Sequence, residues 1–163
     1  MNKTRTCLVC QHENDYDATK CVHCGSPLRI GKTMRLSDEA VDQFFSNYVD
    51  EAVQLAPGAV ALYFVGRDQP EIINVHDSIL LGRGNIDVPG MIDLNRLNAG
   101  LLGVSRRHAL IKPSDGGYAI EDLDSTNGTW VNEQRIPHDT PQPLRSGDQI
   151  RLGHLIFFIQ FAT

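Results

Sequence analysis

Three short stretches of the chain carry arginine, hydroxyl and amide side chains where a folded chain would turn. Segment 105–108 reads Ser-Arg-Arg-His, segment 81–84 reads Leu-Gly-Arg-Gly, and segment 124–129 reads Asp-Ser-Thr-Asn-Gly-Thr. Guanidinium groups bind phosphate through charge-assisted hydrogen bonds, and hydroxyl and amide groups supply further donors. If the fold brings these turns together, they predict an anion site that holds a phosphate group.

A catalytic interpretation of the same residues is weaker. A nucleophile pair of Ser105 and His108 would need a nucleophile elbow and an orienting acid, and neither occurs at a recognisable spacing. The run 82–84 lacks the third glycine and the following helix of a dinucleotide-binding loop. Asp122 and Asp124 suggest a metal site or an acid–base pair, but acidic residues are ordinary between a strand and a turn. We therefore predict a binding protein and not an enzyme.

All four cysteines of the chain lie within eighteen residues, at Cys7, Cys10, Cys21 and Cys24. Each C-x2-C pair can direct two thiolates at one ion, and the intervening loop can fold back to complete a tetrahedron. Four thiolates fill a closed site, which predicts structural rather than catalytic Zn2+. The alternatives are two disulfides or a redox-active pair. The expected cytoplasmic setting disfavours the first, and the lack of a surrounding βαβ unit disfavours the second.

The cysteine segment resembles the small zinc ribbons of many bacterial and archaeal proteins over about residues 6–28. Gly25 follows the last cysteine, where a positive φ lets backbone N–H groups face the sulfur, whereas Gln11 takes the matching place in the first pair. His12 and His23 are expected on the surface, because four thiolates already complete the site. So short a segment has no apolar core, so we expect the metal to supply its folding free energy.

Length, charge and hydropathy restrict the class of protein. The 163 residues suffice for one ordinary domain and a small appendage, and the net charge is −5 with neutral histidines. No apolar run is long enough to cross a bilayer and no signal-peptide core is present, so we expect a cytoplasmic protein without a membrane partner. Residues 1–35 carry six Lys or Arg against three Asp or Glu, an excess that zinc-bound thiolates would reduce to about +1. Nucleic acid is therefore not the expected partner.

The order of elements divides the chain into three parts. Residues 1–30 form the predicted ribbon, residues 31–56 a linker and one amphipathic helix, and residues 57–163 a β-rich domain. Ser37 is the predicted N-cap of the helix, which ends before Pro57. Its apolar stripe consists of Val41, Phe44, Phe45, Tyr48, Val49, Ala52 and Val53. We expect this stripe to pack on the following domain, and a partner or dimer interface is the alternative.

From residue 59 onward the apolar period is that of strands separated by Gly, Pro, Asp and Asn, which is typical of a β-sandwich. No further helix is predicted. The last strand is apolar on both faces and is expected to lie centrally in its sheet, and the long connection 84–103 is expected to border the ligand end. The predicted strands are 60–65, 71–75, 79–81, 109–112, 118–122, 129–131, 149–152 and 154–161.

Four motifs in the β-rich domain resemble the forkhead-associated (FHA) domain family in order and spacing. They are Leu-Gly-Arg at 81–83, Ser-Arg-Arg-His at 105–108, Ser-Thr-Asn-Gly-Thr at 125–129 followed by Val-Asn at 131–132, and Gly-Asp-Gln-Ile at 147–150. The resemblance covers about residues 57–161. It implies a mainly β fold, an eleven-stranded FHA-type sandwich whose loops at one end bind phosphothreonine peptides.

The resemblance also implies a role for each residue of the site. It assigns the phosphate contacts to Arg83, Ser105 and Arg106, and the peptide contacts to Thr126 and Asn127. The residues implied to support the site are His108, Gly82 and Gly128. Arg107 is assigned to solvent or the periphery of the peptide, because neighbouring side chains on extended backbone project to opposite sides. Positions 103 and 104 offer no charged selector, and Arg96 is a candidate for one.

The leading hypothesis is a non-enzymatic module that binds a phosphothreonine-containing protein, a Ser/Thr kinase or its substrate, and carries a structural zinc ribbon. One alternative is a scaffold or oligomerisation protein that does not need phosphate. Another is a zinc-ribbon nucleic-acid binder regulated by the FHA domain. A self-binding switch is a further possibility, because Thr4, Thr6 and Thr33 lie outside the FHA segment.

Overall fold

The computed structural model describes residues 4–7, 10–15, 18–25, 28, 55–65, 67, 69–84 and 89–162. Apart from residues 55 and 56, the predicted linker and amphipathic helix lie outside these ranges. Within the described ranges, no helix is long and apolar enough to cross a membrane.

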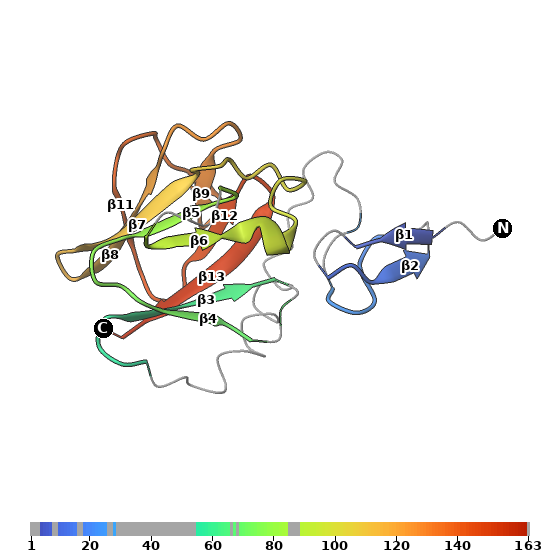
Figure 1. The fold of residues 1–163 in the computed structure, drawn as a ribbon, viewed down its shortest axis with the longest axis horizontal. Coiled ribbons are helices and arrows are strands. Elements are labelled where there is room, and N and C mark those ends of the chain that lie inside the picture. The colour runs from blue at the N-terminus through green and yellow to red at the C-terminus, as the bar shows by residue number, and fades with distance from the viewer. Residues whose placement is uncertain are drawn as a thin grey trace.

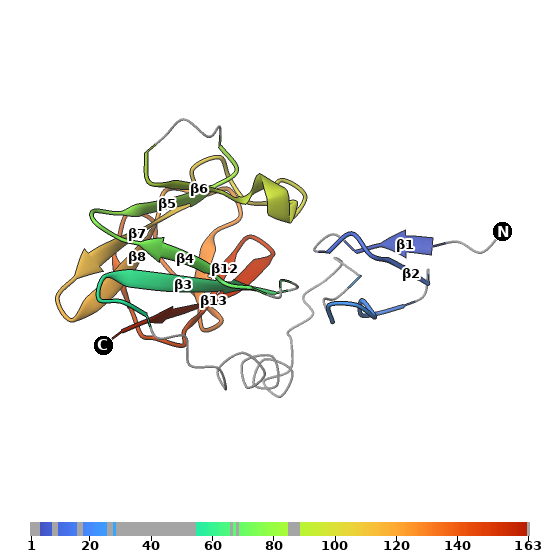
Figure 2. The same ribbon diagram turned by 60° about the horizontal axis from the view of Figure 1, so that its bottom comes forward.

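Two β-sheets form a sandwich (Figure 1). The six-stranded sheet has the order β10-β9-β12-β13-β3-β4, and the five-stranded sheet the order β11-β8-β7-β5-β6. Figure 2 shows the two layers, with β5 and β6 above β3 and β13. The predicted eleven-stranded sandwich is thus confirmed. Its strands are β3 (Ala59–Phe64), β4 (Glu71–Asn74), β5 (Ile79–Gly82), β6 (Met91–Asp93), β7 (Ala109–Ser114), β8 (Gly117–Asp122), β9 (Thr129–Val131), β10 (Gln134–Arg135), β11 (Gln142–Leu144), β12 (Gln149–Leu152) and β13 (Leu155–Phe161).

The three sandwich strands absent from the sequence-based prediction, β6, β10 and β11, all lie at sheet edges. β10 has only two residues, both exposed, and β11 contains Pro143. β6 is short and pairs in parallel with β5, and every other strand pair of the sandwich is antiparallel. Such short strands lack the alternation that identifies a strand in sequence. The connection 84–103 also contains the 3-10 helix η1 (Leu94–Leu97), contrary to the expectation of no further helix.

β13 lies in the middle of the six-stranded sheet, between β12 and β3, as predicted. Phe157, Ile159 and Phe161 on one of its faces belong to the main apolar core, which also includes Leu62 of β3 and Ile111 of β7. Burial of this apolar surface is the main favourable term that holds the two sheets together. The loops at the ends of the strands are positioned by this core.

The opposite face of β3 and β13 carries a second, smaller apolar cluster. Ala61, Tyr63 and Phe158 are buried there, and Leu55 and Val65 pack against them. Alternation along each strand separates these residues from the main core, because successive side chains point to opposite faces. The centre of this sheet is therefore apolar on both sides.

The N-terminal segment forms a separate two-stranded antiparallel sheet of β1 (Thr4–Thr6) and β2 (Glu13–Asp15). Asn14 on β2 is buried, and its side chain connects the two cysteine turns. Its Nδ2 donates to the His12 carbonyl at 2.8 Å, and its Oδ1 accepts from the Val22 amide at 2.8 Å.

Candidate functional site

The three polar stretches singled out from the sequence meet at one end of the sandwich. β5 ends at Gly82, β7 begins at Ala109 and β8 ends at Asp122, and the pairing of Leu81 with Ala109 and of Ala109 with Asp122 aligns these three strand ends. Segment 105–108 therefore lies beside the turn after β5 and the loop 123–128. Side chains that are distant in the sequence become neighbours here.

Arg83 follows β5 and is exposed to solvent. Its Nε donates to the carbonyl of Val104 at 2.8 Å, and its backbone N–H donates to the carbonyl of Ser105 at 3.1 Å. The two terminal Nη groups make no hydrogen bond or ion pair with another described residue. The guanidinium group is thus held by one nitrogen and presents two others to a ligand.

Gly82 allows the Arg83 turn to approach segment 105–108 closely. A Cβ atom at this position would lie 2.1 Å from the carbonyl oxygen of Arg106 and 3.1 Å from that of Ser105. No side chain fits in that space, so glycine is required for the approach and not for an unusual backbone angle. The distance between Arg83 and Ser105 depends on this contact.

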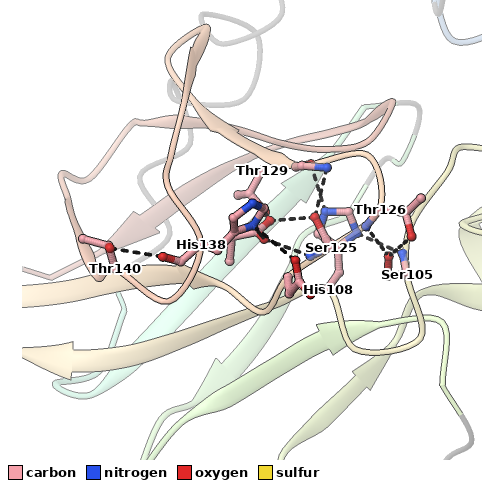
Figure 3. A network of polar contacts seen from close by, with 10 residues as sticks. Ser105, His108, Ser125, Thr126, Thr129, His138 and Thr140 are labelled. Carbon is pink, nitrogen blue, oxygen red and sulfur yellow. Dashed lines mark hydrogen bonds and ion pairs between the residues drawn. The ribbon is translucent and has the colours of Figure 1, made fainter.

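His108 is fully buried and joins the two loops (Figure 3). Its Nδ1 accepts from the Ser105 amide at 2.9 Å, which places the ring proton on Nε2, and Nε2–H donates to the Gly128 carbonyl at 3.0 Å. Burial lowers the pKa of His108 more than its bond to Gly128 and the Asp122 charge raise it. The neutral ring therefore fixes the Ser105 loop to the loop that contains Gly128.

Ser105 and Thr126 contact each other across the site (Figure 3). The Thr126 amide donates to Ser105 Oγ at 3.1 Å, and the two hydroxyl oxygens lie 3.5 Å apart. The Ser105 hydroxyl donates to Thr126 Oγ1 only over this long contact, so its proton can turn to a closer anionic acceptor.

Asn127 follows Thr126 in the loop 123–128, and its side chain is exposed. Its Nδ2 donates to the Gly103 carbonyl at 2.8 Å, and a Cβ at Gly103 would approach that nitrogen to 2.5 Å. One amide proton holds the side chain in place. The other proton and the amide oxygen make no hydrogen bond within the described ranges and can meet a peptide backbone.

Arg106 and Arg107 are both exposed, and neither forms an ion pair with a described residue. The structure thus brings Arg83, Ser105 and Thr126 to one surface with Asn127. It leaves Arg106 and Arg107 as solvent-exposed charges at its border.

A buried carboxylate that the sequence analysis took for an ordinary acidic residue before a turn organises the loop 123–128. Asp122 is 1% exposed and accepts four hydrogen bonds, from the Ser125 amide at 2.9 Å, Ser125 Oγ at 2.7 Å, Thr129 Oγ1 at 2.6 Å and His138 Nδ1 at 3.1 Å. Burial alone would raise its pKa, but the hydrogen bonds, led by Ser125 and Thr129, lower it. Figure 3 labels its partners Ser125, Thr129 and His138. In the sequence, only the spacing Asp-x2-Ser-x3-Thr could have indicated that Asp122 organises this loop.

The four cysteines of the ribbon converge on one point. All four Sγ atoms lie within 4.8 Å of one another, with Cys7 to Cys24 at 3.6 Å and Cys10 to Cys21 at 3.5 Å. A tetrahedral zinc ion with Zn–S bonds of about 2.3 Å would separate its sulfurs by about 3.8 Å, so the arrangement fits such an ion.

The two cysteine turns have the same backbone shape. The amides of Gln11 and Gly25 donate to the carbonyls of Cys7 and Cys21, each at 2.9 Å. Gly25 has the predicted positive φ of 71°, and Gln11 adopts a φ of 61° although it is not glycine. Burial raises the pKa of the Cys21 thiol, but backbone hydrogen bonds, led by that from Cys24, outweigh it and lower the pKa to about 6. A thiol with a lowered pKa forms the thiolate that binds metal.

Comparison with known proteins identifies the family. A model of the FHA domain family matches residues 63–153, more than half of the chain, and the chain belongs to this family. It is 38% identical over 91 residues to the E3 ubiquitin-protein ligase rnf8 of Danio rerio, a match that covers 55% of this chain and 18% of that protein. It is 44% identical over 50 residues to the oxoglutarate dehydrogenase inhibitor of Corynebacterium diphtheriae, covering 31% and 33% of the two chains.

The fold is also similar to a solved structure. The FHA domain of a hypothetical protein from Arabidopsis thaliana superposes with a TM-score of 0.53 at 24% identity, covering 66% of this chain and 88% of that one. The matches to rnf8 and to the oxoglutarate dehydrogenase inhibitor cover no more than about a third of either protein. Residues 63–153, which match the FHA model, do not include the cysteine segment.

Proposed function

We propose that this protein is a non-enzymatic module that binds phosphothreonine-containing peptides. The observation that carries the proposal is the convergence of donors from three loops, namely the Arg83 Nη groups, the Ser105 hydroxyl and the Asn127 amide, with Arg106 at the border. A phosphothreonine offers close to two negative charges and three acceptor oxygens, which this donor set matches. Phosphothreonine, rather than another phosphorylated residue, is what membership of the FHA family suggests.

The test is a fluorescence anisotropy titration with a phosphothreonine peptide library and matched phosphoserine and unphosphorylated peptides. Replacing Arg83 with alanine removes hydrogen bonds to a charged group, which costs on the order of 1.5 to 3 kcal/mol of binding free energy. Arg145→Ala is the matched control, because Arg145 is exposed and follows β11 at the other end of the sandwich. Absence of binding to every phosphothreonine peptide, or equal affinities for wild type and Arg83→Ala, would contradict the proposal.

The ribbon is proposed to hold one structural zinc ion through Cys7, Cys10, Cys21 and Cys24. The converging sulfurs support this. Four thiolates leave no open coordination position, so the metal would stabilise the ribbon and take no part in catalysis. Metal analysis of the purified protein should give one zinc per chain.

A Ser/Thr kinase or one of its substrates is the proposed partner, in the cytoplasm. Such a kinase produces the modified threonine that the site would bind, so kinase and reader would act in sequence. A pull-down from phosphorylated lysate, with wild type compared with an Arg83/Ser105 double variant, tests this proposal. Proteins lost only with the double variant are the candidates, and phosphatase treatment of the lysate should abolish their capture.

The outer sheet face supports a second candidate function, assembly that does not require phosphate. Ile72 of β4 is 56% exposed, and it pairs with Ala61 in the second apolar cluster. This places an exposed apolar side chain beside a buried apolar surface. Light scattering with and without phosphopeptide distinguishes the two functions, because a mass above that of the monomer in both conditions favours assembly.

A further inference from the structure

Arg135, an arginine outside the predicted site, lies against the loop that presents Asn127. It belongs to β10, and its guanidinium group covers Gly128. A Cβ at Gly128 would lie 2.6 Å from Arg135 Nε and 3.0 Å from Nη2. Gly128 directly follows Asn127, so this charge stands one residue from the proposed peptide-binding amide.

An aromatic ring holds Arg135 in this position. Arg135 and Arg151 are the cross-strand neighbours of Trp130 on either side. The Cζ atom of Arg135 lies 5.6 Å from the centre of the Trp130 ring, and that of Arg151 lies 3.7 Å from it. Arginine over an aromatic face is attracted by the ring quadrupole, which restricts the rotamers of its side chain. Arg135 is thus oriented before a ligand arrives.

The two arginines beside Trp130 differ in what else they contact. Arg151 is half-buried, and its Nη1 donates to the Gly153 carbonyl at 2.8 Å, so it supports the turn between β12 and β13. Arg135 is exposed and makes no hydrogen bond or ion pair with any residue that the structure describes. Its charge remains available to a ligand.

No carboxylate of a described residue forms an ion pair with Arg135. Asp122 is buried and accepts from Ser125, Thr129 and His138, and Glu133 Oε1 accepts from Gln149 Nε2 at 3.2 Å. Arg96 is paired with Glu71, so it is a weaker candidate for a selector than the sequence suggested. Although the net charge of the chain is −5, a planar cation that forms no ion pair within the described ranges lies against the Asn127–Gly128 turn.

We infer that Arg135 selects an acidic residue beside the phosphothreonine, so that the preferred ligand is a phosphothreonine peptide with Asp or Glu on the side that passes Asn127. This inference rests on the proposed function. A guanidinium group is suited to the task, because its planar fork can donate two parallel hydrogen bonds to one carboxylate. Arg135 thus determines which flanking residue the peptide carries and does not hold the phosphate itself.

The test compares two families of phosphothreonine peptides that differ only in having Asp and Glu, or Asn and Gln, at the flanking positions. We expect wild type to prefer the acidic member by about three- to five-fold at low salt, the size typical of a good exposed ion pair, and the preference to shrink as salt is added. Arg135→Gln should lose the preference while binding the neutral peptide within about two-fold of wild type. Arg145→Gln, the same charge change at the other end of the sandwich, should keep the preference for the acidic peptide.

Arg135→Lys adds a second readout. It keeps the charge but loses the planar fork, so its preference should fall between those of wild type and Arg135→Gln. Wild type that binds phosphothreonine peptides without an acidic preference, or Arg135→Gln that retains one, overturns the inference and leaves the proposed function standing. Failure of wild type to bind any phosphothreonine peptide overturns both.

Discussion

Two parts of the molecule are each organised around a point on which four groups converge. In the ribbon, four cysteine sulfurs approach one another within 4.8 Å. In the loop after β8, four donors converge on the carboxylate of Asp122. The ribbon collects electron-pair donors, which would bind a cation supplied from outside. The loop collects hydrogen-bond donors around an anion that the chain itself supplies.

This difference determines what each part responds to. Neither apolar core cluster includes a described residue of the ribbon, so its proposed metal would provide its stability, and metal availability would control it. The loop after β8 is attached to a sandwich with a large apolar core, and its geometry depends on the protonation state of two buried groups, Asp122 and His108. One part should respond to chelators and the other to pH.

Removal of zinc should have the largest effect and should be confined to the ribbon. Structural zinc in small domains supplies about 10 to 16 kcal/mol, more than a segment this short can replace. A chelator should collapse the dispersed amide signals of residues 4–28 in an NMR spectrum, while the signals of the sandwich stay in place. Dispersed ribbon signals in metal-free protein would show that the two parts do not differ in this way.

Asp122→Ala should have the next largest effect, on the loop and on stability. It leaves the buried hydroxyls of Ser125 and Thr129 without their acceptor, which costs on the order of 3 kcal/mol of the free energy of unfolding, and it should also weaken phosphopeptide binding. Asp115→Ala is the matched control, because Asp115 is an exposed aspartate in the turn between β7 and β8. Urea unfolding of the two variants measures the contrast, and equal costs would mean that Asp122 does not organise the loop.

Gly82→Ala tests the close approach of the two loops. Its Cβ would lie 2.1 Å from the Arg106 carbonyl oxygen, so segment 105–108 must move. Overpacking of this kind costs about 1 to 3 kcal/mol, and the displaced Ser105 should weaken phosphopeptide binding further. At Gly100 the nearest atom, Arg83 Cδ, would be 3.6 Å away, an ordinary contact. Gly100→Ala should therefore bind like wild type, and a Gly82→Ala variant with normal affinity would refute the argument.

The smallest predicted effect is a pH dependence of stability due to His108. Burial lowers its folded pKa below the unfolded value of about 6.5, so the unfolded chain binds the proton more readily between the two values. Stability is therefore fully present above about pH 6.5 and is lost as the pH falls toward the folded pKa. Urea unfolding at pH 7.5 and 5.5 should show a smaller change in His108→Gln than in wild type. His154→Gln, at an exposed histidine, should keep the wild-type change.

The sequence predicted the central strands and the edge strand β4 but missed the other three edge strands, for a physical reason. A strand such as β3 or β13 has neighbours on both sides and at least one buried face, so its apolar residues reveal it. The edge strands β6, β10 and β11 bury little and depend on pairing with a neighbour that only the folded chain provides. Their residues carry no comparable signal.

The site was predictable only in part, for a related reason. Arg83, Ser105 and Asn127 fall in motifs that a family resemblance makes visible. The supporting carboxylate of Asp122 looked like an ordinary acidic residue before a turn, because its partners Thr129 and His138 are brought to it by tertiary structure. Arg135 was invisible for the same reason, since its place beside Asn127 follows from the pairing of β9 with β10.

The buried ring of His108 has a consequence for the kinetics of recognition. Because it accepts from the Ser105 amide and donates to the Gly128 carbonyl, it fixes the spacing of the two loops. Binding then loses little conformational entropy on the side of the protein, and most of the ordering falls on the peptide. Such a preorganised surface should capture its ligand at a rate set by diffusion and charge rather than by loop closure, and differences in affinity among peptides should appear chiefly in their dissociation rates.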